Sequence, residues 1–266
     1  MGNGAERVSA ERVHAIGIDL AWGAHPTGVA HLVGPVPDGP DSGTPWRLLE
    51  SRTVPGIRAL DAWVGQRLPA DAPAWIAVDA PLVATNPAGT QRAADLALTR
   101  DFRRFRVFCM PVDDRHARRG VELRAAFAER GIGHASPGAT AGATRRGVFE
   151  TFPTAAQLSL FDLSRPLRYK RGTTDMRREG LRALQMRLAM FEDAAVPIEE
   201  TGAWRTLLRR DPMRLRGAEM KALEDELDAV LCALVAALAW RAPRRLLTYG
   251  DLQQGAITVP HPPVPL

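Results

Sequence analysis

Five acidic residues occupy positions in this chain that ordinary folding would not select. Asp19 and Asp79 each end an apolar segment with the character of a strand, and Glu150 lies between apolar residues of a third such segment. Asp225 and Asp228 are three residues apart, a spacing that places both carboxylates on one face of a helix. An unpaired charge buried at such positions costs several kcal/mol or shifts its pKa. The pattern therefore points to a functional site.

A shared cation site would account for all five acids together. Carboxylates that converge repel one another unless a divalent cation lies between them, and all-oxygen ligation favours Mg²⁺ or Mn²⁺ over zinc. Taken singly, each acid also has a purely structural explanation. Asp19 and Asp79 suit Asx turns, Asp225 suits a solvated helix face, and Glu150 could pair with a neighbouring arginine.

Several common catalytic motifs are missing from the sequence. It contains no phosphate-binding Gly-x-x-x-x-Gly-Lys loop, no Gly-x-Ser-x-Gly nucleophile turn and no His-Glu-x-x-His zinc motif. The six histidines are scattered without ligand spacing. Chemistry at a metal-bound water needs no protein nucleophile, which agrees with these absences.

Apolar and β-branched runs predict five strands that would carry three of the acids. These runs cover residues 13–20, 27–33, 46–54, 75–79 and 148–152. The first three follow one another over short connections, which is typical of an antiparallel meander. The fourth is apolar throughout, as a buried parallel strand should be. We expect an α/β fold in which helices cover both faces of a mixed sheet.

The other segments complete a single domain over residues 1–266. Helical patterns cover residues 55–68, 90–130, 173–190 and 216–240, with a break near residue 110, and another helix begins at Pro153. The small-residue stretch 131–147 predicts a loop. Residues 88–147 are expected as a helical and loop insertion. Two terminal strands are indicated at 245–249 and 256–259, although the Pro-rich end also suggests a flexible tail over about 256–266.

Composition narrows the class of protein. The 266 residues are 45% hydrophobic and 24% charged, which excludes wholesale disorder. Two cysteines provide no disulfide framework, and the longest apolar run, 227–240, is shorter than the roughly 20 residues of a membrane span. No apolar leader is evident, so we expect a cytoplasmic protein without a membrane partner. The net charge of +5 favours polyanions without identifying one.

Four short motifs resemble the domain-of-unknown-function family 429, which is described as predicted RNase H-like nucleases. The motifs are Gly17-Ile-Asp-Leu-Ala-Trp22, Val78-Asp-Ala-Pro81, Phe149-Glu-Thr-Phe-Pro153 and Asp225-Glu-Leu-Asp-Ala229. Together they span most of residues 13–240. The late helical pair also resembles the resolvases of the RuvC kind.

This resemblance implies a specific fold and site. The fold would be an RNase H-like five-stranded mixed sheet whose first three strands are antiparallel and whose later strands are parallel. The catalytic carboxylates would be Asp19, Asp79, Glu150 and Asp228, with Asp225 as a further metal ligand. Two-metal-ion hydrolysis of a phosphodiester would follow, with Asp19 as the bridging ligand. Glu150 is an extra acid relative to the resolvase set.

A basic segment could line the approach of a phosphate backbone. Residues 165–187 contain seven arginines and one lysine against two acids. From this segment we take Lys170, Arg168, Arg171 and Arg177 as candidate substrate-binding residues. Lys170 is one of only two lysines in the chain. A compact ammonium group can contact a phosphate where the fork of an arginine does not fit.

The sequence therefore predicts a Mg²⁺- or Mn²⁺-dependent nuclease acting on DNA or RNA, and a homodimer would suit a junction-cleaving enzyme. Two alternatives stay open. One is an ATP-dependent phosphotransferase or nucleotide hydrolase with an actin- or sugar-kinase-like fold. The other is a nucleic-acid-binding protein without catalysis, in which the acids form a hydrogen-bond network.

Overall fold

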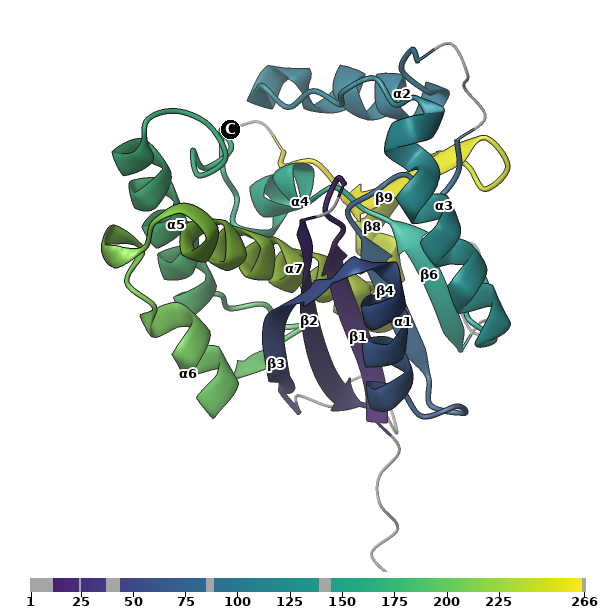
Figure 1. The fold of residues 1–266 in the computed structure, drawn as a ribbon, viewed down its shortest axis with the longest axis horizontal. Helices are drawn as coiled ribbons and strands as arrows, with labels where there is room; N and C mark the ends of the chain where they lie inside the picture. The colour runs from purple at the N-terminus through teal and green to yellow at the C-terminus, as the bar shows by residue number, and fades with distance from the viewer. Residues whose placement is uncertain (1–11, 24, 37–43, 85–88, 139–144, 265–266) are drawn as a thin grey trace, which may run out of the picture.

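A computed structural model describes residues 12–23, 25–36, 44–84, 89–138 and 145–264. It contains one mixed β-sheet with helices on both faces (Figure 1). The strands are β1 (Arg12–Asp19), β2 (Pro26–Pro35), β3 (Trp46–Pro55), β4 (Ala74–Val78), β5 (Gly133–His134), β6 (Arg146–Glu150), β7 (Ile198–Glu199), β8 (Leu246–Asp251) and β9 (Gly255–Pro260).

In the described ranges, seven α-helices and three short 3-10 helices connect these strands. The α-helices are α1 (Gly56–Arg67), α2 (Ala93–Phe102), α3 (Asp114–Glu129), α4 (Pro153–Leu160), α5 (Thr174–Ala189), α6 (Gly202–Arg209) and α7 (Gly217–Arg241). The 3-10 helices are η1 (Arg103–Phe105), η2 (Pro212–Arg214) and η3 (Pro243–Arg245).

The five expected strands form the middle of the sheet. The strand order is β7-β3-β2-β1-β4-β6-β9-β8, with β5 paired to β6. Strands β1, β2 and β3 are antiparallel to their neighbours in the meander, whereas β4 is parallel to both β1 and β6. The predicted mixed sheet is therefore confirmed. The five-stranded sheet that the family resemblance implies is wrong, because the described residues form nine strands. The additional strands are β5, β7 and the two terminal strands β8 and β9.

Alternate residues of the central strands pack into two separate hydrophobic layers. On β1, Val13 and Ala15 join the core beneath α7, while Ile16 and Ile18 join the core beneath α1 and α3. This alternation is the two-residue period of a strand. Figure 1 shows α1 and α7 on opposite faces of the sheet.

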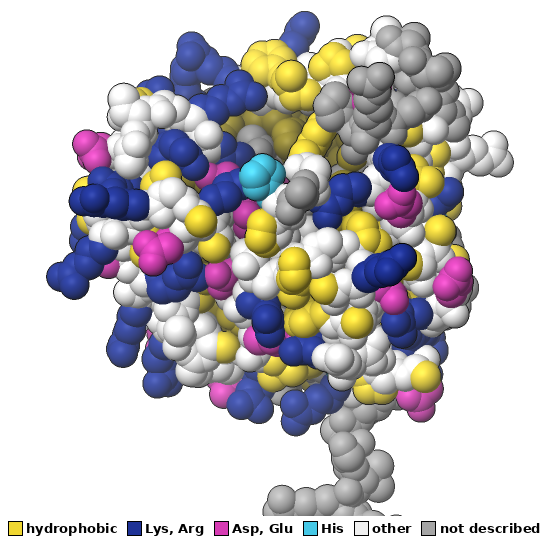
Figure 2. All heavy atoms as spheres, viewed as in Figure 1, with side chains coloured by type: hydrophobic (Ala, Val, Ile, Leu, Met, Phe, Trp, Pro, Cys, Tyr) yellow, Lys and Arg dark blue, Asp and Glu magenta, His cyan; other side chains and the backbone are white. Residues whose placement is uncertain are grey.

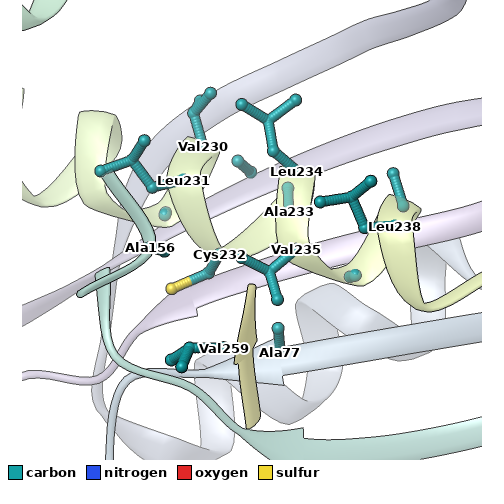
Figure 3. Packing of buried hydrophobic residues seen from close by; sticks show 14 of the residues in the cluster. Ala77, Ala156, Val230, Leu231, Cys232, Ala233, Leu234, Val235, Leu238 and Val259 are labelled. Atoms are coloured by element: carbon teal, nitrogen blue, oxygen red, sulfur yellow. The ribbon is translucent and has the colours of Figure 1, made fainter. Parts of the chain in front are cut away.

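Helix α7 is the central helix of the protein. Its residues are buried almost continuously from Met220 to Ala239, which explains why its sequence is apolar around most of its circumference. Figure 3 shows Cys232 and Val235 on the side of α7 that faces Ala77 and Val259. No helix in the described ranges is long and apolar enough to cross a membrane.

Two glycines allow α7 to approach the sheet closely. A Cβ atom at Gly17 would lie 1.8 Å from the carbonyl oxygen of Ala229, and one at Gly28 would lie 2.1 Å from that of Asp225. Both distances are far below van der Waals contact, so a side chain at either position would displace the helix. These glycines set the position of the helix that carries Asp225 and Asp228.

The segments outside the central sheet partly follow the expectations. The region 88–147 contains α2, η1, α3 and β5, and residues 139–144 of its expected loop lie outside the described residues. The two terminal strands are confirmed as β8 and β9. Because β9 is buried along its whole length, residues 256–260 of the expected flexible tail are strand instead.

Candidate functional site

Asp19 and Asp79 lie side by side at the carboxyl ends of two parallel strands. Ile18 of β1 pairs with Val78 of β4, and the backbone N–H of Asp79 donates a hydrogen bond to the carbonyl oxygen of Ile18 at 2.8 Å. Both aspartates continue the residue alternation that faces α7, since Ala77 belongs to the core on that side. The strand register thus directs both carboxylates toward the helix.

Helix α7 brings two further aspartates to the same place. Gly28 pairs with Asp19 across β1 and β2, and the backbone of Asp225 packs directly on Gly28. One helical turn later, Asp228 is completely buried. We call Asp19, Asp79, Asp225 and Asp228 the aspartate cluster.

Burial and mutual repulsion both favour the protonated forms of the carboxylic acids in the aspartate cluster. Burial and the charge of Asp228 raise the pKa of Asp19 well above its usual range. Burial also raises the pKa of Asp79 to about 6, although the charge of Lys170 opposes that rise.

Tyr169 and Lys170 complete the site from the loop between α4 and α5. The Tyr169 hydroxyl donates a hydrogen bond to Oδ1 of Asp228 at 2.6 Å. The Nζ atom of Lys170 lies 2.8 Å from Oδ2 of Asp228 and 4.0 Å from Oδ2 of Asp79. Burial alone would lower the pKa of Lys170, but the charge of Asp228 raises it well above its usual value. Lys170 is therefore a fixed positive charge.

The charges around the aspartate cluster do not balance. Lys221 pairs with Asp225 from the first turns of α7. Two lysines therefore face four aspartates, which leaves two excess negative charges when all six groups are ionised. Glu224 does not change this balance, because Arg177 pairs with it at 3.1 Å. Protonation of Asp19, whose pKa is raised, would relieve part of the excess, and a divalent cation would relieve all of it.

The donor chemistry of the cluster fits a hard cation. All of its ligand atoms are carboxylate oxygens, which Mg²⁺ and Mn²⁺ prefer. Lys170 forms an ion pair with Oδ2 of Asp228, and no other described residue donates a hydrogen bond to this buried oxygen. Within those residues no three acidic, His or Cys side chains are already gathered around a metal position. The ammonium group of Lys170 lies between Asp79 and Asp228, so a bound cation would require it to move.

Glu150 belongs to a different cluster. Its carboxylate accepts hydrogen bonds from both terminal nitrogens of Arg92, at 2.6 and 3.0 Å, and from the backbone N–H of Leu82. Arg92 also pairs with Asp95 at 2.9 Å, and all three charged side chains are buried. Burial raises the pKa of Glu150 to about 7, although Arg92 opposes the rise.

The strand period explains why Glu150 does not join the aspartate cluster. On β6, Phe149 packs into the core beneath α7, whereas Val148 packs into the opposite core. Glu150 shares the alternation of Val148 and therefore faces away from α7. Thr151 is the residue that follows the Val78–Glu150 pair, level with Asp79. Its buried hydroxyl oxygen has no hydrogen-bond partner among the described residues.

An open cleft of about 850 Å³ extends from the aspartate cluster. Asp79, Tyr169 and Lys170 form one part of its wall, and Glu150 and Arg92 form another. Figure 2 shows a hollow between the regions of α2 and α4, with hydrophobic side chains inside it and Lys and Arg side chains along one side. Within the aspartate cluster, Asp79 is the member that lines the cleft.

The candidate substrate-binding residues divide into two groups. Arg168, Lys170 and Arg171 line the cleft, as do Arg106 and Arg165. Arg177 does not line it. Its guanidinium group instead pairs with Glu224 and donates to the backbone carbonyl of Tyr169 at 3.3 Å. Arg177 thereby holds the loop that presents Tyr169 and Lys170.

Comparison with known proteins identifies the family of the chain. No curated protein and no solved structure matches it. Residues 17–251 match a family model described as a protein of unknown function, DUF429. This range includes the aspartate cluster, the loop that carries Tyr169 and Lys170, and all of α7. Because the match covers most of its length, the chain belongs to the DUF429 family.

Proposed function

We propose that this protein is a divalent-metal-dependent nuclease that hydrolyses phosphodiester bonds in DNA or RNA. The observation that carries the proposal is the convergence of four aspartates, from the ends of β1 and β4 and from α7, beside a basic cleft whose wall includes Asp79. The order β3-β2-β1-β4-β6 and the late helix α7 support an RNase H-like arrangement within the larger sheet.

Asp19, Asp79 and Asp228 would hold the cation, with Asp225 beside them. Bound there, Mg²⁺ or Mn²⁺ would polarise a phosphate oxygen and lower the pKa of a coordinated water. The chain supplies the remaining functions. Tyr169 fixes the orientation of Asp228 through its hydrogen bond to Oδ1. Lys170, released from Oδ2 of Asp228, is within the same cleft to bind a phosphate oxygen.

The excess of negative charge also supports this proposal. Protein interiors seldom keep four carboxylates together, because desolvation and mutual repulsion both destabilise the charged forms. The raised pKa values of Asp19, Asp79 and Asp225 record this cost. Catalytic sites are where such destabilising arrangements are retained.

The test is a Mn²⁺-supported cleavage screen over single strands, duplexes, RNA–DNA hybrids and junctions. We expect cleavage by the unmodified protein and a loss of at least about 100-fold in Asp19→Asn, because one ligand and its charge are removed. Asp175→Asn is the matched control, since the Asp175 side chain is 76% exposed and lies on α5.

Stability provides a second measurement on the same variants. Without metal, Asp19→Asn should melt at a higher temperature than the unmodified protein, because it removes a buried carboxylate that the neighbouring aspartates repel. Equal cleavage by the unmodified protein and Asp19→Asn would reject the site. Stabilisation by nucleotides without any cleavage would favour a phosphotransferase instead.

A further inference from the structure

Four arginines line the cleft without a side-chain partner among the described residues. No hydrogen bond or ion pair joins the guanidinium group of Arg106, Arg165, Arg168 or Arg171 to any described residue, and all four side chains are exposed. Arg92 and Arg210, by contrast, pair with carboxylates at 2.6 and 2.5 Å. The cleft thus keeps its positive charge available for an external anion.

The same cleft exposes large apolar side chains. Phe108 is 58% exposed, Met110 is 62% exposed and Trp22 is 52% exposed, and all three line the cleft. Exposed apolar groups gathered in a concave, charged site are typical of ligand binding rather than of a random surface.

The segment that carries Phe108 is held firmly in place. Val107 is buried in the core beneath α7, and two hydrogen bonds hold the backbone of Cys109. Its N–H donates to the Thr99 hydroxyl at 3.0 Å, and its carbonyl accepts a hydrogen bond from the Gln91 side chain at 2.6 Å. Anchoring at Val107 and Cys109 leaves Phe108 between them, directed outward from a rigid backbone. Its exposure is therefore built into the fold.

Resting on the proposed function, we propose that the cleft binds an unpaired stretch of nucleic acid, with bases stacked on Phe108 and phosphates on the unpaired arginines. Aromatic faces and a basic groove are the two components by which proteins bind single strands. In a duplex the base faces are covered by neighbouring pairs, so Phe108 would have no face to stack on. The substrate of this site is thus a single strand, a flap or an unpaired end.

The position of the aspartate cluster agrees with this substrate. Asp79 and Lys170 form part of the same cleft wall as Arg168 and Arg171. A strand whose phosphates contact these arginines would run past Asp79 and direct a phosphodiester group toward the aspartate cluster. Stacking on Phe108 would set which nucleotide stops there, since an aromatic platform fixes the register of the strand.

Binding is measured on the full chain in EDTA, so that no cleavage occurs. Fluorescence anisotropy compares a labelled oligothymidylate, a labelled oligouridylate and a duplex of equal length at several salt concentrations. We expect the single strands to bind more tightly than the duplex. Phe108→Ala should weaken single-strand binding by about 5- to 100-fold, and Phe108→Tyr should restore it. Leu49→Ala, at an exposed apolar residue on β3, is the control and should change nothing.

Charge and stacking can be separated in the same assay. Arg168→Gln should reduce the slope of log affinity against log salt by about 0.7, whereas Phe108→Ala should leave the slope unchanged. Equal affinity for duplex and single strand, or no effect of Phe108→Ala, would overturn the inference. Single-strand binding without Mn²⁺-dependent cleavage would support the binding site and reject the proposed nuclease activity. Duplex cleavage that is insensitive to Phe108→Ala would support the nuclease activity and reject the binding site.

Discussion

The ammonium group of Lys170 lies 2.8 Å from an oxygen of Asp228, a residue completely buried at the first helical turn beyond Asp225. Apart from Lys170, no described residue donates a hydrogen bond to the same oxygen. Lys170 therefore neutralises a carboxylate that the proposed cation would also bind. The lysine and the cation are competitors for one set of oxygens, and this competition can be measured.

Lys170→Met should reveal the competition. Without metal, the substitution leaves the charge of Asp228 uncompensated, and we expect a loss of about 1–3 kcal/mol in the free energy of unfolding. Removing one partner of a fully buried pair costs about 3–5 kcal/mol, and the 35% exposure of the Lys170 side chain reduces that value. Mn²⁺ should then stabilise the variant more than it stabilises the unmodified protein. Urea unfolding with and without Mn²⁺ measures both effects.

The matched variant is Lys170→Arg, which keeps the positive charge but changes its shape. It should retain most of the metal-free stability and still lose cleavage activity, because the planar fork cannot replace a compact ammonium group. Full activity of Lys170→Arg would show that only charge matters at this position. An identical Mn²⁺ response in Lys170→Met and the unmodified protein would show that the lysine and the cation do not share oxygens.

Gly28→Ala should separate the position of α7 from the chemistry of the aspartates. The added Cβ would lie 2.1 Å from the carbonyl oxygen of Asp225, so α7 must shift. We expect a loss of about 1–3 kcal/mol in stability, the usual cost of overpacking. We also expect a reduced thermal shift on addition of Mn²⁺, because Asp225 and Asp228 move away from Asp19. Gly133→Ala is the control, since a Cβ there meets nothing within 4 Å.

The elements that position Asp19, Asp79 and Asp228 could be predicted from local sequence. The apolar runs before Asp19 and Asp79 define two strands whose ends must be adjacent if the strands are parallel neighbours. The i, i+3 spacing of Asp225 and Asp228 requires only helical geometry. Gly28 offered a further signal, because a glycine inside a β-branched strand marks a close backbone approach.

Other features depend on contacts between distant segments and could not be predicted in this way. Glu150 resembles the other acids in its apolar context, but the alternation on β6 turns it toward Arg92, which is 58 positions away. Counting the alternation from Phe149 could have placed Glu150 on the other face. The basic segment makes Arg177 a candidate substrate-binding residue, yet its guanidinium group pairs with Glu224. Nothing in the local sequence distinguishes Phe108 from a core phenylalanine.

The stability of this protein should fall in mild acid because of His31. Burial and the nearby His14 lower the pKa of His31 to about 3, compared with about 6.5 in the unfolded chain. The unfolded state therefore binds a proton that the folded state does not. Stability is fully present above pH 6.5 and is lost as the pH falls from 6.5 toward 3. By pH 5 the loss from this residue is about 2 kcal/mol.

His31→Gln isolates this contribution. Glutamine does not titrate and can still hydrogen-bond to Nδ1 of His14, which lies 2.9 Å from the ring of His31. Urea unfolding between pH 7.5 and 5 should show a smaller loss of stability in the variant, by about 2 kcal/mol. The raised carboxyl pKa values of the aspartate cluster act in the opposite direction, but both proteins share them. Parallel pH profiles of the two proteins would mean that His31 has the same pKa in the folded and unfolded states, which would contradict the prediction.

Glu150→Gln tests whether the buried ion pair is separate from the catalytic centre. Glutamine keeps the shape of the side chain, and Arg92 retains its pair with Asp95, so we expect only a moderate loss of stability. Cleavage should stay within a few-fold of the unmodified protein, because Glu150 faces away from Asp19 and Asp79. Asp228→Asn is the comparison and should lose cleavage by at least about 100-fold. Arg92→Met should instead destabilise the fold by about 3–5 kcal/mol, since it leaves two buried carboxylates without their shared cation. If Glu150→Gln loses as much cleavage as Asp228→Asn while its melting temperature is unchanged, Glu150 acts in the reaction and the division into two clusters is wrong.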